Sequence, residues 1–238
     1  MIFSIKNSQI TEYKIEFKNL NLNSKQILPL LGYIDGNAPE HIKNIVEEVF
    51  VIAPEKCEIK GGYRLFDKIE ISDNLEKILI LNKQLTTKKI ITTQLRGAGK
   101  IAVFACTAGA GLETWAKELL KGEDPARGYI IDTIASIVVE SAMDLIHDNL
   151  EKQMNKEGLK ITNRFSPGYC GWPLKDNILL FSLLPDNFCN ISLNDSAFMT
   201  PVKSISGFIG IGENVKRAEY QCNFCDKEDC VYRNKYKS

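Results

Sequence analysis

The sequence predicts an α+β domain, and three observations lead to this fold class. Residues 38–54 and 128–153 have the apolar periodicity of helices. Residues 57–106 instead contain short runs rich in Ile, Thr and Val with turn signals between them. Helices and strands do not alternate strictly, which favours an α+β arrangement over a parallel βαβ sheet. The 238 residues allow one good-sized domain, and the 44 % hydrophobic content is sufficient for a core.

Each predicted element follows from its local pattern. Residues 12–17 suggest a first strand, and the helix over 38–54 has apolar positions 42, 45, 46, 49 and 50 on one face. The clearest strands are predicted at 88–94 and 100–106, separated by Gly97-Ala-Gly99. A helix at 112–121 precedes the long helix. The final part, 164–238, contains many Gly and Pro residues and predicts loops, short strands and one helix.

The charge balance argues against nucleic-acid and membrane partners. Thirty basic residues balance thirty acidic residues, and no long basic run occurs. The most apolar stretch, 129–146, is interrupted by Asp132, Glu140 and Asp144 and does not have the pattern of a membrane span. The N-terminus has no export signal, so we expect a cytoplasmic protein.

The segment Thr107-Ala-Gly109-Ala-Gly111 follows a predicted strand and precedes a helix. It has two interpretations. One is the phosphate-binding loop of a Rossmann-type methyltransferase, in which backbone N–H groups and a helix N-terminus face an anion. The other is a tight turn that requires small residues, which the sequence favours because Thr114 occupies the position of the third glycine.

The long predicted helix carries a stripe of polar residues, Asp132, Ser136, Glu140 and Asp144, spaced four apart. The stripe either faces solvent or lines a site. If the stripe lines a site, Glu140 would bind a cationic group such as an amino-acid ammonium.

The segment Arg164-Phe-Ser-Pro-Gly-Tyr169, followed by Cys-Gly-Trp-Pro173, has the irregular backbone typical of ligand loops, although a structural turn would have the same composition. An arginine pairs with carboxylates, and aromatic faces suit a purine or a sulfonium. Together with the carboxylate of Glu140, these residue types match the carboxylate, ammonium, sulfonium and adenine groups of S-adenosylmethionine.

This segment resembles the Arg-x-x-Pro-Gly-Tyr signature of the activation domain of cobalamin-dependent methionine synthase. Two further motifs follow in order: Ser196-Ala-Phe-Met-Thr-Pro201 resembles Ser-Phe-Ala-Met-x-Pro, and Ser204-Ile-Ser-Gly207 resembles Ser-Val-Ser-Gly. Upstream, Glu140 precedes His147 by the interval found in a helix of the family. The resemblance covers residues 128–212, and residues 1–95 are not aligned with it.

The resemblance implies a curved, twisted antiparallel sheet with flanking helices as a single domain over 1–238. It also implies that S-adenosylmethionine lies in a shallow groove. Arg164 would bind its carboxylate and Glu140 its polar methionine end, while Ser166, Gly168 and Tyr169 would form the wall. The chain then resembles a free-standing activator, an S-adenosylmethionine-dependent methyltransferase that remethylates the cobalamin of a separate partner. That partner would be a corrinoid protein or a methionine synthase lacking its activation domain, with an electron donor such as flavodoxin or ferredoxin.

Two other functions remain open. The chain could be a non-catalytic module that binds a corrinoid protein, because an aspartate and a tyrosine of the family's site have no match in register. It could also be a Rossmann-type methyltransferase that uses Gly109 and Gly111.

A cysteine cluster in the tail at 215–238 is not explained by the resemblance. Cys222, Cys225 and Cys230 lie within nine residues, and the odd total of seven cysteines favours metal ligands or reduced thiols over disulfides. The spacing suits zinc or an iron–sulfur cluster if a fourth ligand is added. Cys170 is the first choice for that ligand and Cys189 the second. With only two histidines, a His-rich zinc site is not expected.

Overall fold

A computed structural model describes residues 3–6, 9–34, 37–122 and 124–218. The strands are β1 (Phe3–Lys6), β2 (Ile10–Ile15), β3 (Ile59–Phe66), β4 (Glu70–Ile71), β5 (Ile78–Ile80), β6 (Lys83–Leu85), β7 (Lys100–Thr107), β8 (Lys160–Phe165), β9 (Ser192–Leu193), β10 (Met199–Thr200) and β11 (Ser204–Gly212). The α-helices are α1 (Ser24–Ile27), α2 (Glu40–Lys56), α3 (Lys89–Gln94), α4 (Gly111–Lys121), α5 (Pro125–Lys156) and α6 (Asn177–Phe181). Short 3-10 helices are η1 (Phe17–Leu20), η2 (Leu28–Leu31), η3 (Leu174–Asp176) and η4 (Phe188–Asn190).

A six-stranded sheet in the order β1-β2-β3-β7-β11-β8 organises the fold, and every neighbouring pair is antiparallel. The last strand, β11, lies between β7 and β8. A three-stranded sheet, β4-β5-β6, and the two-stranded pair β9-β10 are separate from it. The predicted α+β class with an antiparallel sheet is therefore confirmed.

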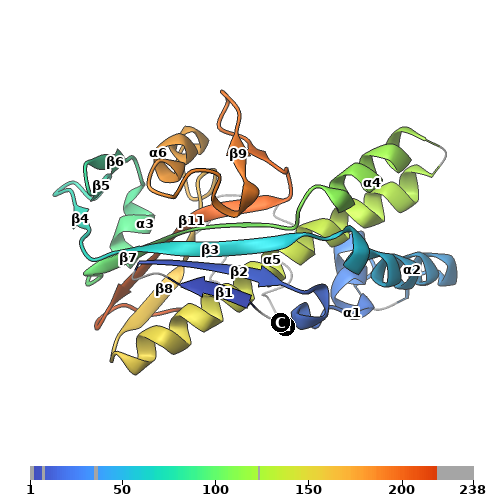
Figure 1. Ribbon diagram of the computed structural model, residues 1–238, viewed down its shortest axis with the longest axis horizontal. Helices are drawn as coiled ribbons and strands as arrows, with labels where there is room; N and C mark the ends of the chain where they lie inside the picture. The colour runs from blue at the N-terminus through green and yellow to red at the C-terminus, as the bar shows by residue number, and fades with distance from the viewer. Residues whose placement is uncertain (1–2, 7–8, 35–36, 123, 219–238) are drawn as a thin grey trace.

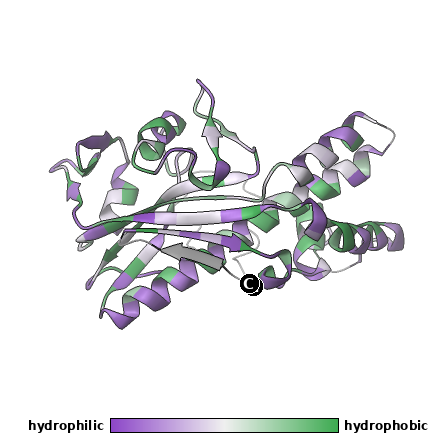
Figure 2. Cartoon of the chain, viewed as in Figure 1, coloured by the Kyte–Doolittle hydropathy of each residue, from purple (hydrophilic) through white to green (hydrophobic). Residues whose placement is uncertain are grey.

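The large sheet separates two cores, because alternate residues of its central strands face opposite sides. On β7, Ala102, Phe104 and Cys106 pack in the core beneath α2, α4 and α5, whereas Ile101, Val103 and Ala105 pack in the core beneath α3, α6 and the small sheet. Figure 1 shows α3, α6 and the small sheet on one side of the large sheet, with α5 running along the other side. Figure 2 shows that α2, α4 and α5 carry both hydrophobic and hydrophilic residues, as expected of helices that cover a core with one side.

Helix α5 is the element that positions the site. It begins at an Asp124 side chain that accepts a hydrogen bond from the Arg127 backbone N–H, with Pro125 in the first turn. It then runs for 32 residues across the sheet. It approaches β3 closely at Gly61, where a Cβ atom would lie 2.5 Å from Ile146 Cδ1. A side chain there would require the Ile146 and Cys106 side chains to shift.

The predictions for the N-terminal half and for α4 and α5 agree with these elements, except at one segment. Residues 88–94, predicted as a strand, form helix α3 instead. Their Ile and Thr content favours strands, but the helix buries Ile91 and Thr92 in the second core. Thr92 Oγ1 also donates to the Lys89 carbonyl oxygen at 3.2 Å, a bond that a helical turn provides.

After residue 164 the sequence predicts only loops, short strands and one helix. The structure differs at β11, which is a strand of nine residues. Its three glycines mask the strand pattern in the sequence. Gly207 is required by packing, because a Cβ atom there would lie 2.0 Å from the Phe165 carbonyl oxygen of β8.

Candidate functional site

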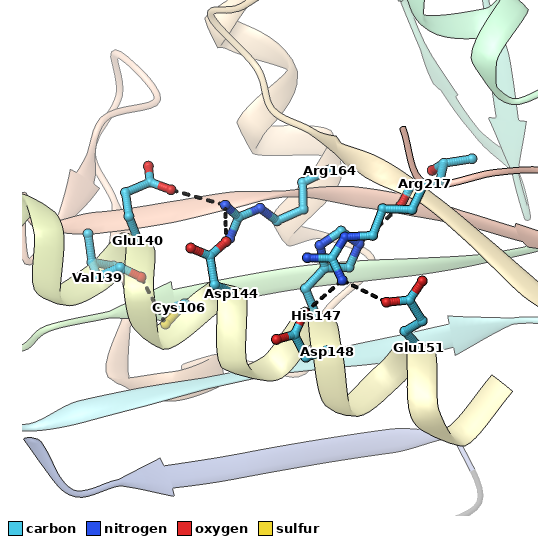
Figure 3. Close-up of polar contacts among 10 residues, drawn as sticks. Cys106, Val139, Glu140, Asp144, His147, Asp148, Glu151, Arg164 and Arg217 are labelled. Carbon is cyan, nitrogen blue, oxygen red and sulfur yellow. Dashed lines mark hydrogen bonds and ion pairs between the residues drawn. The ribbon is translucent and has the colours of Figure 1, made fainter. Parts of the chain in front are cut away.

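Arg164 lies on β8 and points its guanidinium at helix α5 (Figure 3). Its Nη2 atom is 2.8 Å from Asp144 Oδ1 and 3.3 Å from Glu140 Oε2. The Arg164 side chain is 8 % exposed, whereas those of Glu140 and Asp144 are 40 % and 55 % exposed. The structure therefore brings the predicted residues Arg164 and Glu140 into contact, and the carboxylates at this position are partly exposed.

Asp144 is a residue of this site that the sequence prediction placed only in the polar stripe. It makes the shorter of the two contacts with Arg164. The signal was present in its spacing, since residues four apart on a helix lie on the same face and Asp144 follows Glu140 by four. Both carboxylates therefore contact the same guanidinium nitrogen, Nη2 of Arg164.

The stripe on α5 continues as a row of ion pairs with three separate segments. Lys203, just before β11, lies 2.9 Å from Asp132 Oδ2 and donates to Ser136 Oγ at 3.0 Å. Arg217, after β11, lies 2.7 Å from Asp148 Oδ1 and 2.8 Å from Glu151 Oε2. Arg164 occupies the middle of the row. The stripe is therefore a contact surface for other parts of the chain, and not simply the solvent face of a helix.

His147, which the family resemblance pairs with Glu140, lies inside the protein. The residue is 3 % exposed, and its Nε2 atom is 3.0 Å from the Thr162 carbonyl oxygen on β8. Because a carbonyl oxygen only accepts, Nε2 carries a proton and donates. Burial, followed by the charges of Arg217 and Arg164, lowers the pKa of His147 to about 3. The neutral imidazole fixes β8 against α5 two residues before Arg164.

The loop after β8 contains the remaining predicted wall residues, Ser166, Gly168 and Tyr169. Gly168 has φ 91°, and its N–H donates to the Trp172 carbonyl oxygen at 2.8 Å. The Trp172 N–H donates to the Tyr169 carbonyl oxygen at 2.9 Å. Tyr169 is 58 % exposed. The loop therefore presents Gly168 and the Tyr169 ring at the surface, three and four residues beyond the end of β8.

The segment from Thr107 to Gly111 is a tight turn. Gly109 has φ 82°, and a Cβ atom on Gly111 would lie 2.1 Å from the Lys56 carbonyl oxygen. The glycines are needed for this close approach between the start of α4 and the end of α2. Because β7 pairs antiparallel with both β3 and β11, the parallel sheet of a Rossmann fold is absent from the part of the chain around this turn. The Rossmann-type interpretation of Gly109 and Gly111 is therefore wrong.

The cysteine prediction falls mainly on the tail. Cys222, Cys225 and Cys230 lie outside the described residues. Cys170 is half-buried in the loop after Tyr169, with φ 51°. Cys189 is 3 % exposed, and burial raises its thiol pKa. Within the residues that the structure describes, no group of three or more His, Cys, Asp or Glu side chains could hold a metal ion.

In the described part of the chain, none of the helices combines the length and the apolar content that crossing a membrane requires. This includes α5, the longest helix.

Comparisons with known proteins agree with the motifs and with the fold. The family profile "Vitamin B12 dependent methionine synthase, activation domain" matches residues 82–237. Among solved structures, one match is described as "Crystal Structure of the MetH Reactivation Domain bound to AdoHcy". It has a TM-score of 0.61 and 15 % sequence identity, and it covers 89 % of this chain and 80 % of that chain. No curated protein matches the sequence.

The fold is thus that of a methionine synthase reactivation domain. The chain belongs to the family of vitamin B12-dependent methionine synthase activation domains, since the profile spans well over half of its length and includes Glu140, Arg164 and both later motifs.

Proposed function

We propose that this protein binds S-adenosylmethionine at Arg164 and acts as a free-standing activator of a corrinoid-dependent methyltransferase. The observation that carries the proposal is the buried guanidinium of Arg164, held between two partly exposed carboxylates of α5 next to the loop of residues 166–172. Membership of the activation-domain family supports it. The described similarity to a reactivation domain bound to AdoHcy supports the choice of ligand.

The charges at this position complement the amino-acid end of S-adenosylmethionine. Arg164 would take the carboxylate, because its planar fork of N–H groups matches a carboxylate in two parallel bonds. Glu140 would accept from the ammonium group. Ser166, Gly168 and Tyr169 would form the adjoining wall, where backbone groups and an exposed ring are available to the adenosine part.

Bound S-adenosylmethionine supplies an activated methyl group on its sulfonium, and the acceptor in the proposed reaction is the reduced cobalt of a partner's cobalamin. The contribution of this chain is to bind and orient the donor. His147 does not serve as a base, because it is buried and hydrogen-bonded to Thr162. The proposed partners are a corrinoid protein, or a methionine synthase without its own activation domain, and an electron donor such as flavodoxin or ferredoxin.

Isothermal titration calorimetry with S-adenosylmethionine tests the binding step. Arg164→Ala should weaken binding by about 2–5 kcal/mol, the cost of truncating one partner of a desolvated charge pair. Arg217→Ala is the matched control, because Arg217 also pairs with two carboxylates of α5 and lies outside the proposed contacts. Equal losses in the two variants would refute the assignment of Arg164.

The alternative function is a module that binds a corrinoid protein without using a methyl donor. Absence of binding by the wild-type protein, together with capture of a corrinoid protein, would favour it. Transfer of a labelled methyl group from S-adenosylmethionine to cob(I)alamin in the presence of the wild-type protein would exclude it.

We further propose that Cys170, Cys222, Cys225 and Cys230 bind zinc or an iron–sulfur cluster. The support is the spacing of the three tail cysteines in the sequence, together with Cys170, which lies half-buried in the loop after Tyr169. Anaerobic purification with metal analysis, optical spectra and electron paramagnetic resonance tests the proposal. Metal bound by the wild type and lost in Cys170→Ser would support it, whereas a metal-free protein would refute it.

A further inference from the structure

Two consecutive residues outside the family motifs, Asp176 and Asn177, lie where the three motifs meet. Asp176 ends η3, and Asn177 begins α6. Asp176 is half-buried, whereas Asn177 is 1 % exposed. Polar side chains in such positions need hydrogen-bond partners, and each of the two residues has at least one partner in a segment distant along the chain.

Asp176 holds the end of the loop of residues 166–172. Its Oδ2 atom accepts a hydrogen bond from the Trp172 indole Nε1–H at 2.9 Å and another from the Thr86 backbone N–H at 2.7 Å. The Trp172 ring is 1 % exposed and packs against Phe208 of β11, with 4.5 Å between the ring centroids. The Trp172 carbonyl oxygen in turn accepts from Gly168 at 2.8 Å. One carboxylate oxygen thus connects the loop to the segment that precedes α3.

Asn177 connects the other two motifs. Its Nδ2 atom donates to the Ala197 carbonyl oxygen at 3.2 Å, and its Oδ1 atom accepts from Ser206 Oγ at 2.8 Å. Ala197 belongs to the motif at 196–201 and Ser206 to the motif at 204–207. A side-chain amide can make both bonds because it has a donor and an acceptor, whereas an ionised carboxylate would face the Ala197 carbonyl with a second acceptor.

The loop itself requires such external support. Gly168, Cys170 and Gly171 all have positive φ values, of 91°, 51° and 73°. A cysteine in this region is disfavoured unless the surrounding structure holds it there. The hydrogen bond that Asp176 accepts from Trp172 and the packing of the Trp172 ring provide that restraint at the C-terminal end of the loop.

We propose that Asp176 and Asn177 are positioning residues that fix the loop of residues 166–172 relative to the motif at 196–201 and to β11. The proposal rests on the proposed function where it concerns the ligand, S-adenosylmethionine. Its consequence is that the loop is preformed, so that the donor does not have to order it on binding.

Hydrogen–deuterium exchange on the full-length protein tests the positioning role without any ligand. Asp176→Ala should make the amides of residues 166–172 exchange about tenfold faster, because the Trp172 indole N–H and the Thr86 backbone N–H lose their shared acceptor. Asp176→Asn keeps one side-chain oxygen for both donors and should exchange like the wild type. Trp172→Phe, which keeps a ring against Phe208 but loses the indole donor, should exchange faster in the same amides.

Ile80→Val is the control for a general loss of stability, because Ile80 is fully buried in the small sheet and makes none of these hydrogen bonds. It should leave exchange in the loop unchanged. If Asp176→Ala speeds up exchange no more in the loop than Ile80→Val does, the positioning role is refuted.

Calorimetry with S-adenosylmethionine on the same variants tests the consequence for binding. The dissociation constant should rise about threefold to tenfold in Asp176→Ala, and stay unchanged in Asp176→Asn and Ile80→Val. An equal rise in Ile80→Val would refute the effect on the ligand. Absence of binding by the wild type would instead refute the proposed function, while the exchange measurement would still decide the positioning role.

Discussion

His147 provides a test of the interior between α5 and β8. Its pKa is lowered from 6.5 to about 3, chiefly by burial, so the folded protein keeps it neutral where the unfolded chain takes up a proton. The contribution of the neutral imidazole to the free energy of unfolding is fully present above the pKa that His147 has in the unfolded chain. It is lost as the pH falls through the window from 6.5 to about 3. We therefore expect acid to destabilise the fold through this residue.

The magnitude follows from the two pKa values. Between pH about 7.5 and pH about 5, the free energy of unfolding should fall by about 2 kcal/mol through His147 alone. Urea denaturation at these two pH values measures it. The variant His147→Gln keeps an N–H donor for the Thr162 carbonyl oxygen but does not titrate, so its stability should fall by about 2 kcal/mol less than that of the wild type over this interval.

The other histidine, His41, lies exposed on α2 and supplies the control His41→Gln, which should keep the pH dependence of the wild type. If the wild type and His147→Gln lose stability in parallel, the imidazole is not held neutral by burial and the reasoning fails.

Two further outcomes follow from the packing and the ion pairs. Gly111→Ala should lower the free energy of unfolding by about 2 kcal/mol or more, since its Cβ would lie 2.1 Å from the Lys56 carbonyl oxygen. Gly99→Ala, where no atom lies within 4 Å of the added Cβ, should have almost no effect in the same thermal unfolding experiment. Arg217→Ala should cost about 1 kcal/mol or less, because the side chain is 30 % exposed. This cost should shrink further when urea denaturation is repeated in about 1 M salt, and a cost independent of salt would contradict an ion-pair origin.

Local patterns were sufficient to predict the longer helices α2, α4 and α5. The apolar periodicity over 128–153 lies within α5, and the predicted helix at 112–121 matches α4 within one residue. The same kind of pattern failed at 88–94, where β-branched residues form α3 because burial of Ile91 and the Thr92 hydrogen bonds outweigh their strand preference.

The candidate site was predicted only where its residues belong to motifs. Arg164 and Glu140 could be proposed from sequence and lie in contact in the structure. Asp144 could have been proposed as well, because it follows Glu140 by four residues and so lies on the same face of the helix. Asp176 and Asn177 could not be proposed, because all of their hydrogen-bond partners except Trp172 lie on distant segments that only the fold brings together.

The sheet order has a consequence for how the protein is made. Among the described strands, β8 pairs with β11 alone, and β11 ends at Gly212, near the C-terminal end of the described chain. During synthesis the N-terminal part emerges first, so β8 leaves the ribosome well before the strand that joins it to the sheet. Arg164 therefore acquires its final place only after β11 has inserted beside β7. A nascent chain or a proteolytic fragment without β11 should lack the contact between Arg164 and α5, so the proposed site would form only once β11 is in place.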